Sequence, residues 1–306
     1  MRKIFVVPYF GKFPNYIQLW LDSCGRNESF NWVLITDCKL NTLDIPSNVF
    51  CIISTLDKIE NIFKEKIHPK IFLTTPYKLC DYRPAYWMIL DYYEIKYDYW
   101  GYCDIDVIFG DLSTFIQDEI LVKYDKFLSN GHLTLYKSNE KVKNAFKLTG
   151  SKYLWKDIYF IEENIGFDEH HGINKIFKFN QFNCYENISI VADIDPQFKN
   201  FYLYYQAFNH KKQYFSLEDG KVLQHYMVKN KIYEREFAYI HIQKRKMTLN
   251  ISTNNSNSFL INDNGFSLLN LNKKENFKIF KETFKVKINK LRTKLRFYKN
   301  RFMNVV

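Results

Sequence analysis

The stretch Tyr99-Trp100-Gly101-Tyr102-Cys103-Asp104-Ile105-Asp106-Val107-Ile108-Phe109 decides the fold expected for this chain. Its first half predicts a buried strand that ends at two carboxylates, and a Gly110-Asp111 turn follows the run. Side chains at positions i and i+2 share one face of a strand, so Asp104 and Asp106 point the same way. Such oxygen ligands suit a hard divalent cation, Mg²⁺ or Mn²⁺, which usually shares its coordination with substrate phosphates. The alternative is a solvated turn after an edge strand.

Short apolar runs alternate with helical segments on both sides of this stretch. We expect strands at residues 3–8, 30–35, 49–54, 127–138 and 222–228, and helices at residues 15–24 (capped by Asn15), 56–66 and 84–93. This alternation predicts an α/β fold with a mostly parallel sheet. Ligands bind beyond the carboxyl ends of the strands in such sheets. Tyr9, Thr36 and Asp37 fall at strand ends and are therefore candidate nucleotide contacts.

The sequence around the two carboxylates also resembles a known family. Asp81-x-Arg83, a helix, and then Trp-Gly-Tyr-x-Asp104-x-Asp106 are similar to the metal-dependent glycosyltransferases of the GT-A fold, most of all to families 32 and 8. Residues 1 to about 247 further resemble bacterial proteins from surface-polysaccharide gene clusters. Trp100 replaces one glycine of the family 32 pattern, and the spacing from Asp81 to Arg83 is shorter than in that family.

This resemblance implies a GT-A, Rossmann-like domain that binds a nucleotide sugar. It would transfer a hexose, from a UDP-sugar, to a bacterial surface glycan or lipid-linked saccharide, with Mn²⁺ or Mg²⁺ as cofactor and with retention of configuration. The first acid, Asp104, would contact the ribose or act through water, and Asp106 would bind the metal. The remaining roles that the resemblance implies are His241 as third metal ligand, Lys244 and Lys246 on the diphosphate, Asp81 and Arg83 on the donor sugar, and Lys78 on the nucleotide or phosphate. His225 is the alternative to His241.

The polar run Asp168-Glu169-His170-His171-Gly172 is the candidate acceptor side of the site. Asp168 or Glu169 could serve as a general base, or stabilise positive charge at the anomeric carbon. The histidine pair could instead bind zinc, although nothing nearby in the sequence completes a tetrahedral set. A polar turn with helix caps is the third interpretation.

Charge is concentrated at the end of the chain. The 306 residues carry a net charge of +11, and residues 273–306, with twelve Lys/Arg and two Glu, account for +10 of it. Apolar residues recur at helical spacing through this tail, at positions 277, 280, 284, 288, 291, 295, 298 and 302. A basic amphipathic helix of this kind is typical of binding to an anionic membrane surface. A coiled coil, and a helix packed on the body, are the alternatives. Nucleic acid is not an expected partner because the body is nearly neutral and lacks a recognised motif.

The expected organisation is a catalytic domain at 1–247, a linker or irregular cap rich in Asn and Ser at 248–272, and a membrane-surface helix at 273–306. The six cysteines show no Cys-x-x-Cys spacing, which indicates a reducing compartment. With no run of about 20 apolar residues, we expect a cytoplasmic protein, peripheral on the inner face of the membrane. Two other functions stay open: a nucleotidyl- or phosphotransferase, and a non-catalytic membrane-associated adaptor.

Overall fold

The computed structural model describes residues 1–169, 172–198, 201–243, 245–251, 257–263, 265–270 and 272–279. Its largest sheet has seven strands, with parallel pairing from β3 through β2 and β1 to β4. Its last strands are mixed: β7 is antiparallel to both β4 and β6, and β8 is parallel to β6. In spatial order the strands are β3 (Val49–Ile53), β2 (Phe30–Thr36), β1 (Lys3–Tyr9), β4 (Tyr99–Cys103), β7 (Leu133–Lys137), β6 (Lys126–Asn130) and β8 (Cys184–Tyr185).

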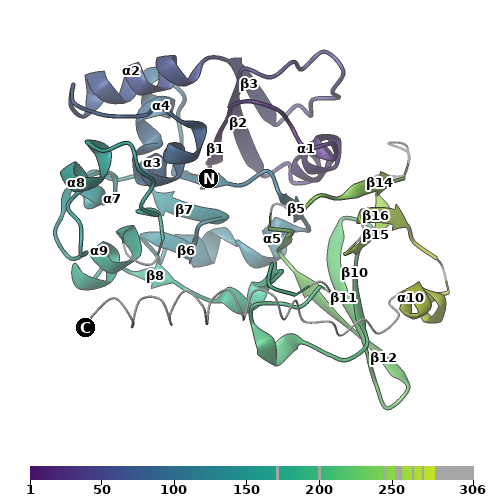
Figure 1. Ribbon diagram of the computed structural model, residues 1–306. Helices are drawn as coiled ribbons and strands as arrows, with labels where there is room; N and C mark the ends of the chain where they lie inside the picture. Colours follow the sequence, from purple (N-terminus) through teal and green to yellow (C-terminus); the bar gives the residue numbers. More distant parts are fainter. Residues whose placement is uncertain are drawn as a thin grey trace, which may run out of the picture.

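The described residues also form two smaller sheets (Figure 1). The three-stranded sheet has β13 (Tyr239–His241) between β5 (Val107–Phe109) and β9 (Val191–Asp193). The six-stranded sheet contains, in order, β12 (Lys231–Phe237), β11 (Lys221–Val228), β10 (Gln213–Glu218), β15 (Ser258–Asn262), β16 (Gly265–Leu268) and β14 (Thr248–Asn250). The protein is therefore a mixed α/β structure built on several sheets.

Helices cover both faces of the seven-stranded sheet. The α-helices are α1 (Ile17–Gly25), α2 (Leu56–Lys66), α3 (Leu79–Tyr82), α4 (Trp87–Tyr92), α5 (Leu112–Phe115), α6 (Asp118–Leu121), α7 (Glu140–Lys143), α8 (Trp155–Tyr159), α9 (Ile173–Phe179) and α10 (Lys273–Ile279). Short 3₁₀ helices lie at η1 (Pro76–Lys78), η2 (Arg83–Ala85), η3 (Ala145–Lys147), η4 (Ile188–Ile190) and η5 (Gln206–Phe208). No helix in these described ranges is long and apolar enough to cross a membrane.

The side chains of β1 show how the first two cores form. Ile4 and Val6 belong to a core shared with α2, α4 and α9, whereas Phe5 and Val7 belong to a core shared with α1 and β5. Successive side chains of a strand point to opposite faces, so a strand covered on both sides is apolar throughout. Burial on both faces explains why this strand was predictable from its sequence.

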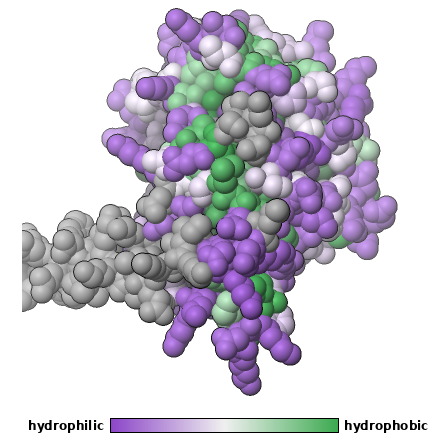
Figure 2. Space-filling model, turned by 90° about the vertical axis from the view of Figure 1, so that its right-hand side faces the viewer, coloured by the Kyte–Doolittle hydropathy of each residue, from purple (hydrophilic) through white to green (hydrophobic). Residues whose placement is uncertain are grey.

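A third core lies between the three-stranded and six-stranded sheets. Ile108 of β5 and Ile240 of β13 pack there against Phe215 and Phe259 of the larger sheet. On the face that the molecule presents in Figure 2, hydrophobic residues form only a narrow green band between hydrophilic ones. Most apolar side chains of the six-stranded sheet, among them Phe215, Leu217 and Ile261, are buried in the molecule.

Most of the expected N-terminal elements are confirmed. The strands at β1, β2 and β3 agree within a residue or two, and α2 has the expected bounds. Asn15 was predicted to cap α1, but it does not. Tyr16 is the capping position, and the Asn15 amide donates to the Met247 carbonyl oxygen. The strand expected at residues 127–138 is also wrong, because Gly131 and His132 form the turn between β6 and β7.

The segment expected to be a linker or irregular cap, residues 248–272, contains β14, β15 and β16 in its described part. Phe259, Leu260, Ile261 and Phe266 are fully buried in the sheet, so this segment extends the fold. The Asn- and Ser-rich composition that suggested a linker is concentrated at residues 252–257. Most of that short stretch lies outside the described residues.

The start of the basic tail packs against the body. Phe277 of α10 meets the Tyr214 ring edge-on at 4.8 Å between centroids, and the fully buried Asn276 donates to the Asn270 carbonyl oxygen at 2.9 Å. Lys273 forms an ion pair with Glu234 of β12. The rest of the expected amphipathic helix, residues 280–306, lies outside the described residues.

Candidate functional site

A large cavity lies where β1 and β4 of the central sheet end. It has a volume of about 1150 Å³, and its wall includes Tyr9 from the end of β1 and Asp104 and Asp106 from the segment after β4. β4 ends at Cys103, and Val107 begins β5 in a different sheet, so Asp104-Ile105-Asp106 is the crossing between two sheets. The two carboxylates therefore stand at the carboxyl ends of parallel strands, where α/β proteins bind ligands.

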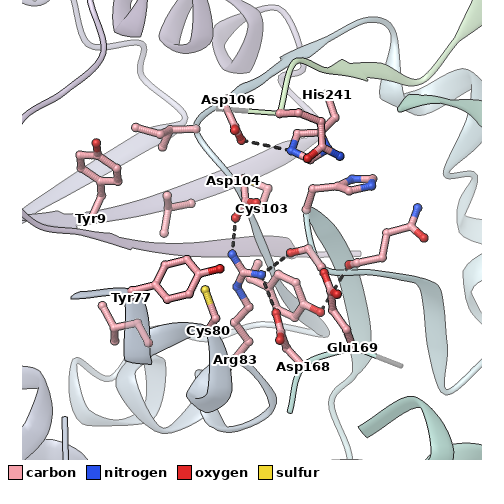
Figure 3. A pocket seen from close by; sticks show the side chains of 18 of the residues that line it. Tyr9, Tyr77, Cys80, Arg83, Cys103, Asp104, Asp106, Asp168, Glu169 and His241 are labelled. Carbon is pink, nitrogen blue, oxygen red and sulfur yellow. Dashed lines mark hydrogen bonds and ion pairs between the residues drawn. The ribbon is translucent and has the colours of Figure 1, made fainter. Parts of the chain in front are cut away.

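The three residues predicted to bind metal converge in this cavity. Asp104, Asp106 and His241 each offer a ligand atom, and these atoms all lie within 4.8 Å of one another. His241 ends β13, which pairs antiparallel with β5, and this pairing brings its Nε2 to 3.4 Å from Asp106 Oδ1 (Figure 3). The alternative histidine, His225, is fully buried in the six-stranded sheet between Glu218 and Ser216.

His241 is held by acids on both ring nitrogens. Its Nδ1 lies 2.8 Å from Asp193 Oδ1, at the end of β9. Burial disfavours the charged imidazolium, but the interactions with Asp106 and Asp193 outweigh it and raise the pKa of His241 to about 10. Burial disfavours the charged form of Asp193, but its interactions with His132 and His241 outweigh this effect and keep the pKa of its carboxyl below the ordinary value.

Arg83 connects the metal-side acids to the predicted acceptor side. Its guanidinium forms ion pairs with Asp104 and, at 2.6 Å from Nη1 to Oδ2, with Asp168, and it also donates to the Gly131 carbonyl oxygen (Figure 3). The guanidinium lies over the Tyr102 ring at 4.8 Å from its centroid. Burial raises the pKa of Asp168 to about 6, against the opposing effect of Arg83. Arg83 is thus a bridge between two carboxylates, a geometry that suits the planar fork of arginine.

Asp168 and Glu169 differ sharply in environment. Asp168 is almost completely buried and is paired with Arg83, whereas Glu169 is exposed and lines the cavity. A Cβ added at Gly131 would lie 1.9 Å from Glu169 Oε1, so the missing side chain at Gly131 makes room for this carboxylate. His170 and His171 lie outside the described residues.

Lys78 and Asp81 do not line the cavity, contrary to the prediction that they contact the donor. Both side chains are fully buried and form an ion pair of 2.9 Å. Asp81 accepts hydrogen bonds from the backbone N–H groups of Ile165, Gly166 and Phe167. Because its oxygens are occupied by this loop, Asp81 holds the segment that leads to Asp168.

Of the other residues predicted to contact the nucleotide or diphosphate, some line the cavity and others do not. Tyr9 is on the wall and stacks on Phe13 with 5.4 Å between ring centroids. Thr36 is fully buried, and Asp37 is exposed and accepts from the Gly11 N–H, so neither is on the wall. Lys246 is exposed away from the cavity, and Lys244 lies outside the described residues.

Residues without a predicted role also line the cavity. Arg245 is on the wall in place of Lys246, with its Nη2 donating to the carbonyl oxygens of Asp195 and Phe198. Asp193 and His132 stand beside His241. An available signal for Asp193 was the apolar strand Val191–Ala192 ending at an acid, the same pattern that drew attention to Asp104.

The chain belongs to the DUF6625 family, a family of unknown function, whose model matches residues 5–270. The matched region includes every residue of the cavity wall and, apart from the first two residues of β1, the strands of the three sheets. No functionally curated protein matches the sequence.

Proposed function

We propose that this protein is a metal-dependent glycosyltransferase that moves a hexose from a UDP-sugar to a saccharide acceptor. The observation that carries the proposal is the convergence of Asp104, Asp106 and His241 on one cavity wall, although the histidine is far from the acids in the sequence. Their positions agree with those expected from the resemblance to GT-A enzymes. The parallel order β3-β2-β1-β4, with the acids directly after β4, further supports assignment to the GT-A fold.

The chemistry of the three ligands fits Mn²⁺ or Mg²⁺. Two carboxylates and one imidazole leave coordination positions for the oxygens of a diphosphate, and both cations favour oxygen-rich coordination. When bound, the cation would neutralise charge on the leaving nucleoside diphosphate. Arg245 is the proposed partner of the same diphosphate, because it lines the cavity and follows His241 closely on the chain. It takes the role expected of Lys244 and Lys246.

The other wall residues suit the donor and the acceptor. Tyr9, on the wall at the end of β1 and backed by the stacked ring of Phe13, offers an aromatic surface for a nucleotide base. Arg83 fixes Asp104 and Asp168, so Asp168 is the less available of the two candidate acids. Glu169 is exposed in the cavity and is the better candidate to accept the proton of the attacking hydroxyl.

In the proposed reaction the bond between the anomeric carbon and the diphosphate oxygen breaks, and UDP leaves. The acceptor oxygen bonds to the anomeric carbon and gives its proton to Glu169. Retention at the anomeric carbon is proposed from the resemblance to families 8 and 32. A cavity of about 1150 Å³ is large enough for a nucleotide sugar together with part of an acceptor. The proposed acceptor is a bacterial surface glycan or a lipid-linked saccharide, which the protein would reach from the inner membrane surface through its basic tail.

The test is release of UDP from a panel of UDP-hexoses by the full chain, with Mn²⁺, with Mg²⁺ and with EDTA. We expect metal-dependent release from at least one donor and its loss in Asp106→Asn. Asp44→Asn is the matched control, since Asp44 is exposed and lies away from the cavity. Release that is equal in EDTA, or equal in Asp106→Asn and the control, would contradict the proposal.

A further inference from the structure

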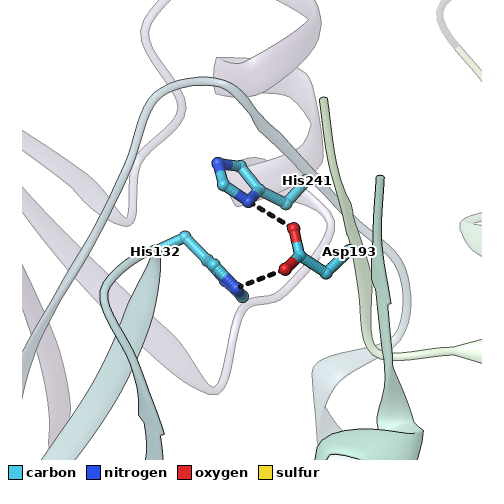
Figure 4. A group of neighbouring side chains, drawn as sticks. All are labelled: His132, Asp193 and His241. Atoms are coloured by element: carbon cyan, nitrogen blue, oxygen red, sulfur yellow. Dashed lines mark hydrogen bonds and ion pairs between the residues drawn. The ribbon is translucent and has the colours of Figure 1, made fainter. Parts of the chain in front are cut away.

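His132, Asp193 and His241 form a second group of side chains beside the three proposed metal ligands. Asp193 Oδ1 lies 2.8 Å from His241 Nδ1, and Asp193 Oδ2 lies 3.7 Å from His132 Nε2 (Figure 4). The two imidazole rings are 4.3 Å apart between centroids. His132 is itself fixed by Tyr239, whose hydroxyl lies 2.8 Å from His132 Nδ1. The group is therefore braced from the turn between β6 and β7 and from β13, as well as from β9.

The two nitrogens of His241 face different acids. Nδ1 faces Asp193, and Nε2 faces Asp106, which is one of the proposed metal ligands. An imidazole that binds a cation through one nitrogen keeps its proton on the other, and a carboxylate that accepts that proton fixes the tautomer and the ring orientation. Gln243 donates to the same Asp193 oxygen at 2.8 Å, which further restrains the carboxylate.

We infer that Asp193 is the positioning residue of the cation site, holding the His241 ring so that Nε2 is directed at the cation shared with Asp104 and Asp106. This inference rests on the proposed metal role of His241. Asp193 acts through His241 and does not itself bind the cation. His132 and Tyr239 restrain the second oxygen of Asp193 from the opposite side and stay outside the coordination.

A cation could also be bound by His132, Asp193 and His241 in place of Asp104, Asp106 and His241, and measurements of metal affinity distinguish the two sites. Ligand atoms of His132, Asp193 and His241 also lie within 4.8 Å of one another, so these three residues could themselves hold the cation. In that arrangement Asp193 and His132 would be ligands, and Asp106 would be dispensable for binding. The two arrangements therefore predict opposite orders of effect among variants.

The experiment measures Mn²⁺ affinity of the full chain by electron paramagnetic resonance, with folding of each variant checked by circular dichroism. We expect Asp193→Ala to weaken Mn²⁺ binding by about 10- to 100-fold, the usual effect of removing such a partner. Asp193→Asn keeps an acceptor oxygen and should recover part of the affinity, while Asp106→Asn abolishes binding. His132→Phe removes only a restraint on Asp193 and should weaken binding less than Asp193→Ala does, and the exposed control Asp44→Asn should stay within about threefold of the wild type.

Nitrogen-15 NMR of His241 with Mg²⁺ gives a readout that loss of packing alone would not move. The wild type should show a protonated Nδ1 and a bound Nε2, and Asp193→Ala should show a mixture of tautomers. Wild-type Mn²⁺ affinity in both Asp193 variants would overturn the inference and leave the proposed function standing. Loss of binding in His132→Phe with retention in Asp106→Asn would overturn it in favour of the second arrangement. Failure of the wild type to bind Mn²⁺ would overturn both the inference and the proposed function.

Discussion

Lys78 and Asp81 form an ion pair in which neither side chain is exposed to solvent, with 2.9 Å between Nζ and Oδ2. Lys78 also donates to the carbonyl oxygens of Ile158 and Glu163. Asp81 accepts hydrogen bonds from three backbone N–H groups of the loop at residues 165–167. These hydrogen bonds tie η1 and α3 to the segment that carries Asp168. Removing one partner of a buried pair leaves an uncompensated charge, and this costs far more than losing a surface pair.

We therefore expect Asp81→Ala to lower the free energy of unfolding by about 3 to 5 kcal/mol, measured by urea denaturation. The exposed control Asp44→Asn should lie within about 0.5 kcal/mol of the wild type. Donor binding should fall only as far as the folded fraction falls. Full stability of Asp81→Ala together with a selective loss of sugar-nucleotide turnover would instead return Asp81 to the donor site.

The bridge made by Arg83 predicts a functional effect without a large effect on the fold. Lysine keeps the charge but offers a single ammonium group, which cannot donate to Asp104 and Asp168 as a planar fork does. Arg83→Lys should lower UDP release at least about tenfold, or about 1.4 kcal/mol, while the melting temperature changes little. The matched control is Arg2→Lys, on an exposed arginine. Equal turnover in the two variants would show that the bridge has no role in the reaction.

Asp168 predicts a dependence of stability on pH. Its carboxyl has a pKa of about 6 in the folded chain, above the ordinary value of 3.8, chiefly because it is buried. Between these two pH values the folded state binds more protons than the unfolded state, so the stabilising contribution is present below pH 3.8 and is lost as the pH rises to about 6. The loss amounts to about 3 kcal/mol at 1.36 kcal/mol for each pH unit.

Asp168→Asn cannot titrate and should lack this component. The difference in unfolding free energy between Asp168→Asn and the wild type should therefore shift in favour of the variant as the pH rises from 4 to 7. Urea denaturation at several pH values measures this difference. A difference that is constant over the range would contradict the shifted pKa of Asp168.

At Gly101 the backbones of β4 and β7 lie too close together for a side chain. A Cβ at this position would lie 2.0 Å from the Thr134 carbonyl oxygen on the neighbouring strand β7. Since backbone cannot move aside cheaply, Gly101→Ala should separate β4 from β7 and abolish soluble expression or lower the melting temperature strongly. The matched control is Gly11→Ala, where the added carbon meets nothing within 4 Å and only the positive φ of 111° is strained. That strain costs about 1 to 3 kcal/mol, and an equal effect of the two variants would contradict the expected collision.

The packing of α10 determines where the tail can be cut. Removal after residue 272 would expose Tyr214 and delete the buried Asn276, so we expect a lower melting temperature. Removal after residue 279 keeps these contacts and should leave the melting temperature and UDP release nearly unchanged. The chain that ends at residue 279 lacks most of the basic residues of the tail. Its binding to anionic vesicles should therefore fall below that of the full chain. Equal binding of the two chains to the vesicles would contradict a membrane role for the tail.

The elements that were predictable from the sequence are those with strong local patterns. β1, β2 and α2 have uninterrupted apolar runs or helical spacing, and the acids after β4 follow directly from the position of that strand. Of the six-stranded sheet, only the strand at residues 222–228, which is β11, was expected. The pairing of β10 with β15 joins segments that lie far apart in the sequence, and the Asn- and Ser-rich stretch at residues 252–257 directly precedes β15. Pairings of this kind leave little trace in local composition.

In the site, residue type and strand position were enough to indicate Asp104, Asp106 and Tyr9. Lys78 and Asp81 were predicted to contact the donor, but they form a buried ion pair. A charged pair near the start of a helix has the same sequence pattern whether it binds a ligand or stabilises a neighbouring loop. The position of Asp193 beside His241 depends on parallel pairing of β9 with β13, which no local pattern specifies. Burial, too, separates Asp168 from Glu169, although the two are neighbours in the sequence.

The central claim is that this cavity binds a divalent cation together with a uridine diphosphate. The most direct measurement is a crystal structure of the protein with Mn²⁺ and UDP, using anomalous diffraction at the manganese absorption edge. The expected result is one manganese peak in contact with Asp106 and His241, with the UDP diphosphate at the same peak and near Arg245. A manganese peak away from Asp106, or UDP bound outside the cavity, would contradict it.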